Sequence, residues 1–307
     1  IIIIDDQSDD RTAEIVRTMS AGARFPVTLL SSDIDSSIRS PKIRAMTLGI
    51  QHSLSEIIMT TDADCTMSPR WVSSVNAHFT GNVGLVTGLT VYEPGTVRSA
   101  LFYGMQFLDF ISYTAIAAGA IGRGRVVVSN GSNMAFRIRA FDECGGFGNL
   151  IQINTGDDSL LAQRIVADGQ WKARFAYAQD SVVRTRPVDT WKAVLHQRMR
   201  WVGQTAYYPP SMMFFMICTF IMFVLLAVTV PLSFFLWTPV PLFVLLVNNI
   251  TDYLMMRRFT DVTGTGDAMR YFIPTALLHI PFVLLATVGG YFFSFDWKDR
   301  TMTKEAR

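Results

Sequence analysis

An uncharged, strongly apolar stretch at residues 211–237 constrains this chain most. It is long enough to cross the hydrocarbon core of a bilayer as one helix. Two further hydrophobic segments follow, at residues 238–256 and 271–295. We therefore expect residues 1–206 to form a soluble α/β domain and residues 207–307 to form a membrane domain with about three hydrophobic segments.

The charge balance and the cysteines exclude several classes of protein. The formal net charge is only +2, which gives no reason to expect a nucleic-acid partner. The three cysteines are scattered, without the spacing of a metal site or a disulfide framework, so a reducing compartment is expected. Basic residues do gather before the first hydrophobic segment, where they suit lipid headgroups or a phosphorylated ligand: Arg184, Arg186, Lys192, Arg198 and Arg200.

Two carboxylates follow the apolar run at residues 57–61. A short apolar run predicts a buried strand, and acids just past its end lie where open α/β sheets bind ligands. In extended or turn geometry Asp62 and Asp64 point the same way, so one divalent metal ion could contact both. A simple strand-end turn is the alternative, since Asp is common in turns.

A second acidic pair, Asp5 and Asp6, follows the apolar residues 1–4, and a helical pattern comes next. Strand, acidic turn and helix make half a βαβ unit. Such a turn can present Asp5 or Asp6 to the base or ribose of a nucleotide. It can equally serve only to begin the helix, with acids favourably placed near the helix N-terminus.

Asp157 and Asp158 lie at the start of another helical pattern, at residues 159–167. Capping explains one acid there well and two less well. A later amphipathic helix, at residues 188–206, places Gln197, Arg200 and Trp201 on one face by their spacing. The alternative for that face is an interfacial helix with its Trp at the membrane boundary.

The remaining expected elements follow from hydrophobic periodicity and from turn residues. Helix 96–118 is very apolar, and we place it against the core or the bilayer surface. A small polar loop at residues 130–133 could lie over a ligand. Strands are expected at residues 27–31, 83–92, 126–129, 134–137, 172–176 and 181–186, and helices at residues 13–19, 41–54 and 69–79.

These motifs, in this order, resemble those of glycosyltransferase family 2, whose GT-A (nucleotide-diphospho-sugar transferase, Rossmann-like) domain carries D, DxD, DD and QRxRW signatures. The resemblance covers the soluble domain nearly end to end. Members with Gly-Asp-Asp, QRxRW, about three C-terminal membrane segments and a final Trp-Lys-x-Arg look closest, as in residues 156–158 and 297–300 here. The family's first strand, and usually a leading membrane helix, are missing, so we expect an N-terminally truncated chain.

The resemblance implies an inverting enzyme that moves a sugar from a nucleotide sugar, with UDP expected, to a lipid or lipid-linked acceptor. Asp64, with Asp62, would bind Mg²⁺ or Mn²⁺ at the donor diphosphate. Asp158 would be the catalytic base, and Asp157 would hold neighbouring contacts. The other expected ligand-binding residues are Asp5 and Asp6 for the uridine, Arg198 and Arg200 for the phosphates, and Gln197 and Trp201 for the acceptor side.

Two alternatives remain at this stage: a processive polysaccharide synthase, and a non-catalytic scaffold that only binds nucleotide sugar. We expect an integral membrane protein of the inner or plasma membrane with its catalytic domain in the cytoplasm. Three full crossings would then leave Lys298, Arg300 and Lys304 outside, against the positive-inside rule. The last segment, which Pro274 and Pro281 interrupt, is therefore either re-entrant or an exception to the rule.

Overall fold

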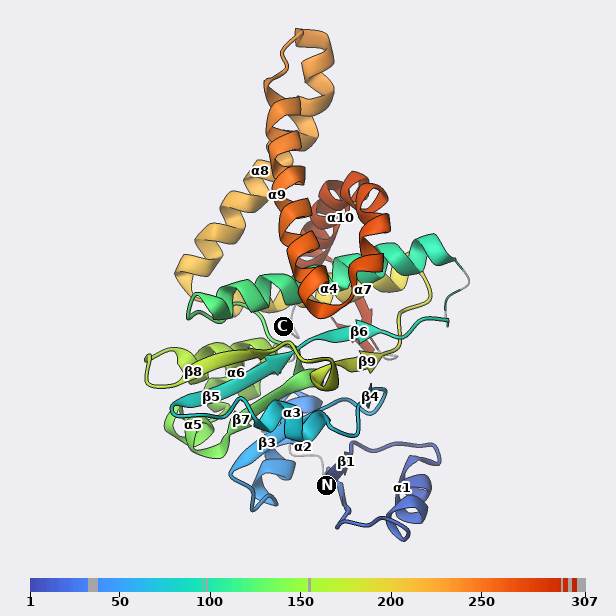
Figure 1. The fold of residues 1–307 in the computed structure, drawn as a ribbon, viewed down its shortest axis with the longest axis vertical. Helices are drawn as coiled ribbons and strands as arrows, with labels where there is room; N and C mark the ends of the chain where they lie inside the picture. The colour runs from blue at the N-terminus through green and yellow to red at the C-terminus, as the bar shows by residue number, and fades with distance from the viewer. Residues whose placement is uncertain are drawn as a thin grey trace.

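The computed structural model describes residues 1–32, 38–95, 97, 99–153, 156–293, 295–297 and 300–302. Strands and helices alternate up to residue 207, and three long helices follow (Figure 1). The predicted α/β class is therefore confirmed.

The central sheet has four strands, in the order β3 (Ile57–Thr60), β7 (Met134–Arg137), β5 (Val83–Gly88) and β8 (Lys172–Ala176). Strands β5 and β8 are parallel, whereas β7 runs antiparallel to both β3 and β5. The sheet is thus mixed, unlike the parallel sheet of a dinucleotide-binding fold. Every residue of β5 is buried, as expected of a strand covered on both faces.

The first two strands form a separate parallel pair. β1 (Ile2–Asp5) and β2 (Thr28–Ser31) are joined through α1 (Thr12–Ser20). Helix α2 (Pro41–Gln51) begins where Ser40 Oγ accepts a hydrogen bond from the Ile43 N–H, with Pro at its first position. α2 packs against β1, with Gly49 of α2 beside the Ile4 side chain.

One predicted strand, at residues 83–92, is wrong because it is two strands in two different sheets. β5 ends at Gly88, where an added Cβ would lie 2.6 Å from Asn133 Nδ2, so this position requires glycine. β6 (Thr90–Tyr92) then pairs with β9 (Val183–Thr185), which also pairs with β4 (Thr66–Met67). The chain therefore passes from one sheet to the next at Gly88.

The strand predicted at residues 126–129 is also wrong, because that segment is irregular. Its backbone groups bond to side chains of α6 (Asp157–Val166) instead of to a neighbouring strand. The Ser129 N–H donates to Ser159 Oγ, and Gln163 Nε2 donates to the Val127 carbonyl. The other short elements are α3 (Trp71–Asn76), α5 (Ile138–Glu143), η1 (Gly131–Asn133), η2 (Gly148–Gln152), η3 (Gln179–Ser181), η4 (Gln204–Tyr207), β10 (Phe295–Trp297) and β11 (Arg300–Met302).

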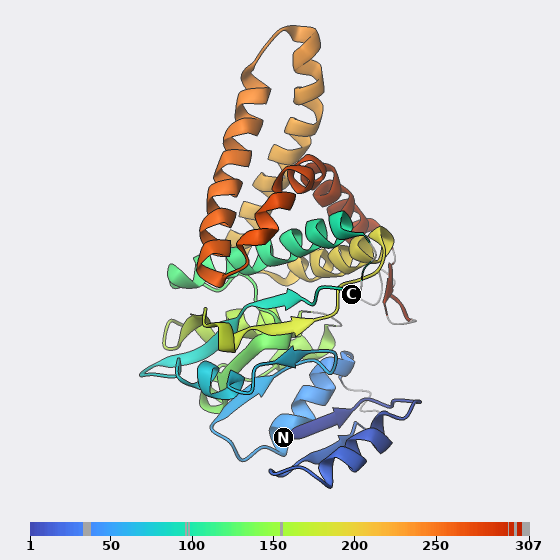
Figure 2. The ribbon, with the colours of Figure 1, turned by 45° about the vertical axis from the view of Figure 1, so that its right-hand side comes forward.

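Two helices lie side by side above the sheets: α4 (Ala100–Gly122) and α7 (Trp191–Gly203) (Figures 1 and 2). Their rings meet along the contact, with Phe102 against Trp191 at 4.7 Å and Phe110 against Trp201 at 5.9 Å between centroids. Most of α4 is buried, which confirms its expected place against the core. We call these two helices the α4–α7 layer.

The C-terminal helices lie on the outer side of this layer. α8 (Pro210–Leu236) and α9 (Val240–Thr263) project away from the sheets as a hairpin, and α10 (Phe272–Phe292), preceded by η5 (Gly266–Tyr271), stays closer (Figure 2). Among the described residues, two segments are long and apolar enough to cross a membrane: Pro210–Leu236 and Gly266–Phe292. This suggests membrane association. Of the Trp-Lys-x-Arg motif, Lys298 and Asp299 lie outside the described residues.

Candidate active site

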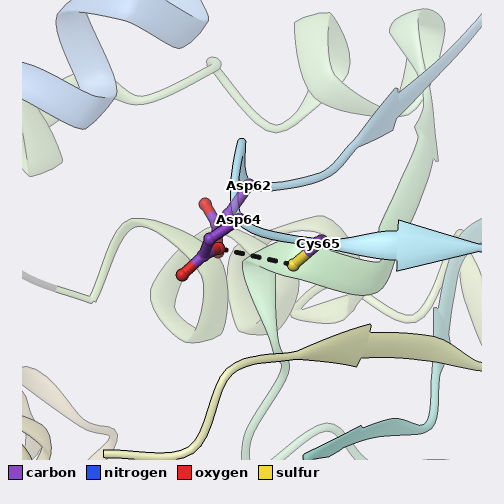
Figure 3. Close-up of side chains that lie close together, drawn as sticks. All are labelled: Asp62, Asp64 and Cys65. Atoms are coloured by element: carbon purple, nitrogen blue, oxygen red, sulfur yellow. Dashed lines mark hydrogen bonds between the residues drawn. The ribbon is translucent and has the colours of Figure 1, made fainter. Parts of the chain in front are cut away.

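Asp62 and Asp64 lie just past the end of β3, as the sequence predicts (Figure 3). Ligand atoms of Asp62, Asp64 and Cys65 all lie within 4.8 Å of one another. Burial and then the charges of Asp62 and Asp64 raise the pKa of the Cys65 thiol, so it stays protonated. The two carboxylates fit a hard divalent cation such as Mg²⁺ or Mn²⁺, which prefers oxygen to a protonated thiol.

Lys42, in the first turn of α2, lies between two of the predicted acidic motifs. Its Nζ is 3.1 Å from Asp62 Oδ1 and 3.6 Å from Asp157 Oδ2. Burial alone would lower the pKa of Lys42, but the charges of Asp157, Asp62 and Asp158 outweigh it and raise this pKa. Sequence reasoning missed this residue, because the only local signal was a single cation at a helix start.

Asp157 and Asp158 begin α6, after Gly156 with a left-handed φ of 88°. Asp157 is 8% exposed, and its Oδ2 accepts no hydrogen bond, so the ion pair with Lys42 is its described partner. Such a buried oxygen without a donor is uncommon away from functional sites. A Cβ at position 156 would meet Gln204 Oε1 at 2.8 Å, so glycine is required at this turn.

Asp158 is held by two backbone donors. Its Oδ2 accepts from the Gly131 N–H at 2.9 Å, and its Oδ1 accepts from the Ser159 N–H at 2.6 Å. Burial, followed by repulsion from Asp157, raises the pKa of Asp158, while Lys42 and the two N–H donors oppose the rise. A carboxylate with a raised pKa accepts a proton more readily, which is what a general base requires.

The polar loop ahead of β7 links the end of β3 to Asp158 of α6. The Gly131 carbonyl accepts from Thr60 Oγ1 at 2.7 Å, which ties the loop to the end of β3. Gly131, Ser132 and Asn133 are all buried. The loop therefore supports the acidic motifs, and its expected place over a ligand stays a prediction.

The two arginines of α7 that were predicted to bind phosphate, Arg198 and Arg200, lie in two different places. Burial lowers the pKa of Arg200, and the charges of Asp158, Asp157 and Asp62 oppose that shift, so Arg200 lies within electrostatic range of all three carboxylates. Arg198 instead points into the α4–α7 layer. It is 1% exposed, and its Nε donates to Asp109 Oδ2 at 2.7 Å.

Gln197 and Trp201 belong to the surroundings of Arg198. Gln197 Oε1 accepts from Arg198 Nη1 at 2.5 Å and from the Tyr92 hydroxyl at 3.3 Å. The Arg198 guanidinium lies 4.2 Å from the centroid of the Trp201 ring, which also meets Tyr113 edge-on at 5.2 Å. The structure thus accounts for Arg198 by packing and ion pairing in the layer, and not by a place among the carboxylates.

Asp5 and Asp6 lie at the end of β1, and the described contacts give each a local partner. Asp5 Oδ1 accepts from the Ser8 N–H at 3.1 Å, which closes the turn. Asp6 Oδ1 forms an ion pair with Arg44 of α2 at 2.9 Å and accepts from the Ser32 hydroxyl. Helix α2 therefore contacts all three acidic motifs: Asp62 and Asp157 through Lys42, and Asp6 through Arg44.

The structure thus gathers one group of residues that are far apart in the sequence. We call this group the carboxylate cluster: Lys42, Asp62, Asp64, Asp157, Asp158 and Arg200. Several oxygens and two cations around one point can neutralise a diphosphate and hold a metal ion and a base next to it.

Comparison with known proteins agrees with this chemistry. No curated protein gave a significant match. The profile of glycosyl transferase family 21 matches residues 1–292, nearly the whole chain. Assignment to family 2, which the motif order suggested, is not confirmed, but the expectation of a sugar-transferring enzyme is. The chain belongs to glycosyl transferase family 21 and is a glycosyltransferase.

Proposed function

We propose that this enzyme transfers a sugar from a UDP-sugar to the hydroxyl of a membrane lipid, with inversion at the anomeric carbon. The observation that carries the proposal is the carboxylate cluster, which combines metal-binding oxygens, two cations and a hydrogen-bonded carboxylate with a raised pKa. Helices α8 to α10 lie on the side of the α4–α7 layer away from the sheets (Figure 1), and Pro210–Leu236 and Gly266–Phe292 are apolar enough to span a membrane.

The leaving diphosphate requires neutralisation of its charge. Asp62 and Asp64 would hold Mg²⁺ or Mn²⁺, which when bound supplies a Lewis acid for the phosphate oxygens. Lys42 and Arg200 would bind the same phosphates, since both cations already lie among the carboxylates. Lys42 was not among the phosphate-binding residues predicted from the sequence, and we add it to them here. We place Arg198 outside the donor site, because its guanidinium is already paired with the Asp109 carboxylate.

The acceptor requires a base, and we assign that role to Asp158. The acceptor oxygen forms a new bond to the anomeric carbon, the bond from that carbon to the diphosphate oxygen breaks, and UDP leaves. The proton of the acceptor hydroxyl passes to Asp158. Its bonds to Gly131 and Ser159 orient the carboxylate, and further lone pairs remain for the proton. Asp157 would keep Lys42 in position through their ion pair.

A lipid acceptor is supported by the apolar helices and by the family, which resembles ceramide glucosyltransferases. Trp201 and Gln197, on α7, would border the acceptor, and Asp5 and Asp6 would bind the uridine.

We further propose that the catalytic domain faces the cytoplasm. Both α8 and α9 meet the catalytic domain at one end, where Arg257 and Arg258 lie, as the positive-inside rule favours.

The test is a donor screen with the purified full-length protein in detergent. Release of UDP from UDP-glucose and from other UDP-sugars is measured with ceramide, with a total lipid extract and without lipid, in the presence of Mg²⁺ or Mn²⁺. We expect lipid to stimulate UDP release and one glycosylated lipid to form. Release that lipid does not change would contradict the acceptor class, and a long polymer would favour a processive synthase instead.

A further inference from the structure

Helix α10 begins on the α4–α7 layer. Tyr271, the residue before its first turn, lies directly on the backbone of α4. A Cβ at Gly104 would lie 2.2 Å from the Tyr271 ring, so glycine at this position allows the contact. The start of α10 is therefore fixed at the surface of the layer that faces away from the sheets.

The far end of α10 returns to the same layer. A Cβ at Gly290 would lie 2.8 Å from the Met199 carbonyl oxygen of α7, and one at Gly289 would lie 2.9 Å from the end of the Met199 side chain. The Tyr291 and Thr205 hydroxyls are 2.8 Å apart. Two glycines and a hydroxyl pair thus hold the end of α10 against α7 and the residues just after it.

A bend between these two contacts explains how one helix can meet the same layer twice. α10 has 21 residues, enough to span about 31 Å if straight. Pro281 lies inside it, and an interior proline removes a backbone hydrogen bond and kinks a helix. Figure 2 shows α10 rising from the layer, turning, and descending toward α7.

The α8–α9 hairpin behaves differently. The turn between α8 and α9 lies far from the layer (Figure 1), and Trp237 in this turn is 93% exposed. The end of α9 comes back to the catalytic domain, where Gln179 Nε2 donates to the Thr263 carbonyl at 2.6 Å. α8 and α9 therefore leave the catalytic domain and return to it as a pair, whereas both ends of α10 stay on the layer. Among the described residues α9 is not one of the two segments apolar enough to span a membrane by themselves, so its crossing rests on its packing against α8.

The outer surface of the α10 arch is apolar. Ile273, Leu277 and Leu285 are exposed, and no residue of α10 carries a formal charge apart from the titratable His279. An apolar surface of this kind is stable in the acyl region of a bilayer and not in water. One leaflet supplies about half of the roughly 30 Å hydrocarbon core, which suits an arch that rises and returns.

We propose that α10 is a re-entrant element that enters the lipid leaflet on the catalytic side and leaves it on that same side. The protein then crosses the membrane only with α8 and α9. The position of β10, which lies against α7, agrees with this, because it places residues 295–297, just after α10, beside α7. Lys298, Arg300 and Lys304 then obey the positive-inside rule, which three full crossings would violate.

The test is the side of the membrane on which epitopes lie in sealed vesicles from cells that express the full chain. One epitope follows Gly81, an exposed turn that marks the catalytic side. A second is inserted between Trp237 and Thr238, and a third follows Arg307. Each is probed with antibody before and after permeabilisation. We expect the first and third epitopes on one side and the second on the other.

This inference rests on the proposed membrane insertion of the α8–α9 hairpin. The three epitopes distinguish a failure of that insertion from a failure of the re-entrant path of α10. If the epitope after Arg307 lies with the one at Trp237, α10 crosses the membrane and the re-entrant arch is wrong. If the Trp237 epitope lies with Gly81, the α8–α9 hairpin does not cross, and both proposals fail. As a second measurement, the variant Thr301→Cys, in a chain whose three native cysteines are replaced, is labelled with an impermeant maleimide. Labelling from the catalytic side supports the arch, and labelling from the far side overturns it. Neither measurement reads activity, so sugar transfer is tested separately.

Discussion

The molecule gathers charged side chains in two places, and the two differ in kind. In the carboxylate cluster, the exposed Asp62 and Asp64 and the more buried Asp157 and Asp158 outnumber Lys42 and Arg200, and Asp157 Oδ2 accepts no hydrogen bond from the described residues. In the α4–α7 layer, Gln197 Oε1 accepts a hydrogen bond from Arg198, and the acidic partner of Arg198 among the described residues is Asp109. That pair is balanced in charge, hydrogen-bonded and surrounded by aromatic rings.

The difference separates a site from a structural contact. A local excess of acid that includes the buried Asp157 costs stability unless a cation compensates it, and such unbalanced groups concentrate at functional sites. A closed ion pair has no binding capacity left, but removal of one partner leaves the other as an uncompensated buried charge. Substitutions in the carboxylate cluster should therefore affect transfer, and substitutions in the pair should affect folding.

The largest effect is expected for Asp158→Asn. Loss of the base should lower kcat for transfer by about 10²- to 10⁴-fold while UDP binding stays within a few-fold. The measurement is UDP release at saturating donor and lipid, with UDP affinity measured in parallel. Asp180→Asn, at a partly exposed ion pair with Arg70, is the matched control and should keep its activity. Turnover of Asp158→Asn near the parent rate would remove the base assignment.

Next is the ion pair of the α4–α7 layer. Arg198→Met alone should destabilise the protein by about 3–5 kcal/mol, because Asp109 is left buried and unpaired. Arg198→Met combined with Asp109→Leu should recover most of that loss. Thermal unfolding of the protein in detergent measures both. A double variant no more stable than the single one would show that the charges do not act as a pair.

A smaller effect is expected for the metal ligands. Asp64→Ala should weaken the affinity for the metal ion, measured through donor binding, by about tenfold or more. Loss of a residue that only hydrogen-bonds to a metal ligand already lowers metal affinity or activity about 10- to 100-fold. The measurement is a Mg²⁺ or Mn²⁺ titration of UDP binding. Cys65→Ser is the control, because its protonated thiol should contribute little. An unchanged titration for Asp64→Ala would exclude this residue as a ligand.

The smallest effect concerns pH. The pKa of Asp158 is raised above 3.8, so the base loses its charge, and kcat falls, at a higher pH than for an ordinary Asp. Lys42 opposes this rise, so Lys42→Met should move the acid limb of the kcat profile to still higher pH. Lys172→Met, on the exposed side of β8, should leave the limb in place. A shift to lower pH would contradict the placement of Lys42.

Much of the fold could be predicted locally. The strands at β1, β2, β3, β7 and β8 follow from short apolar runs, and α2 and α6 follow from Pro41 and from Asp157 at their starts. The strand at residues 83–92 could not be divided from sequence, because the division depends on Asn133, which lies far along the chain beside Gly88. Lys42 was missed for the same reason: its partners, Asp62 and Asp157, are distant in sequence.

The sequence by itself determined the apolar helices, the order of the acidic motifs and the class of chemistry, because each depends on residue types at short spacing. Only the tertiary structure decided what Arg198 and Arg200 do. Two residues apart on a helix, they point to nearly opposite sides, and spacing cannot tell which side will face a partner. Asp109, 89 residues away from Arg198 in the sequence, forms the ion pair that holds Arg198 inside the layer. The other arginine was thereby left facing the carboxylates.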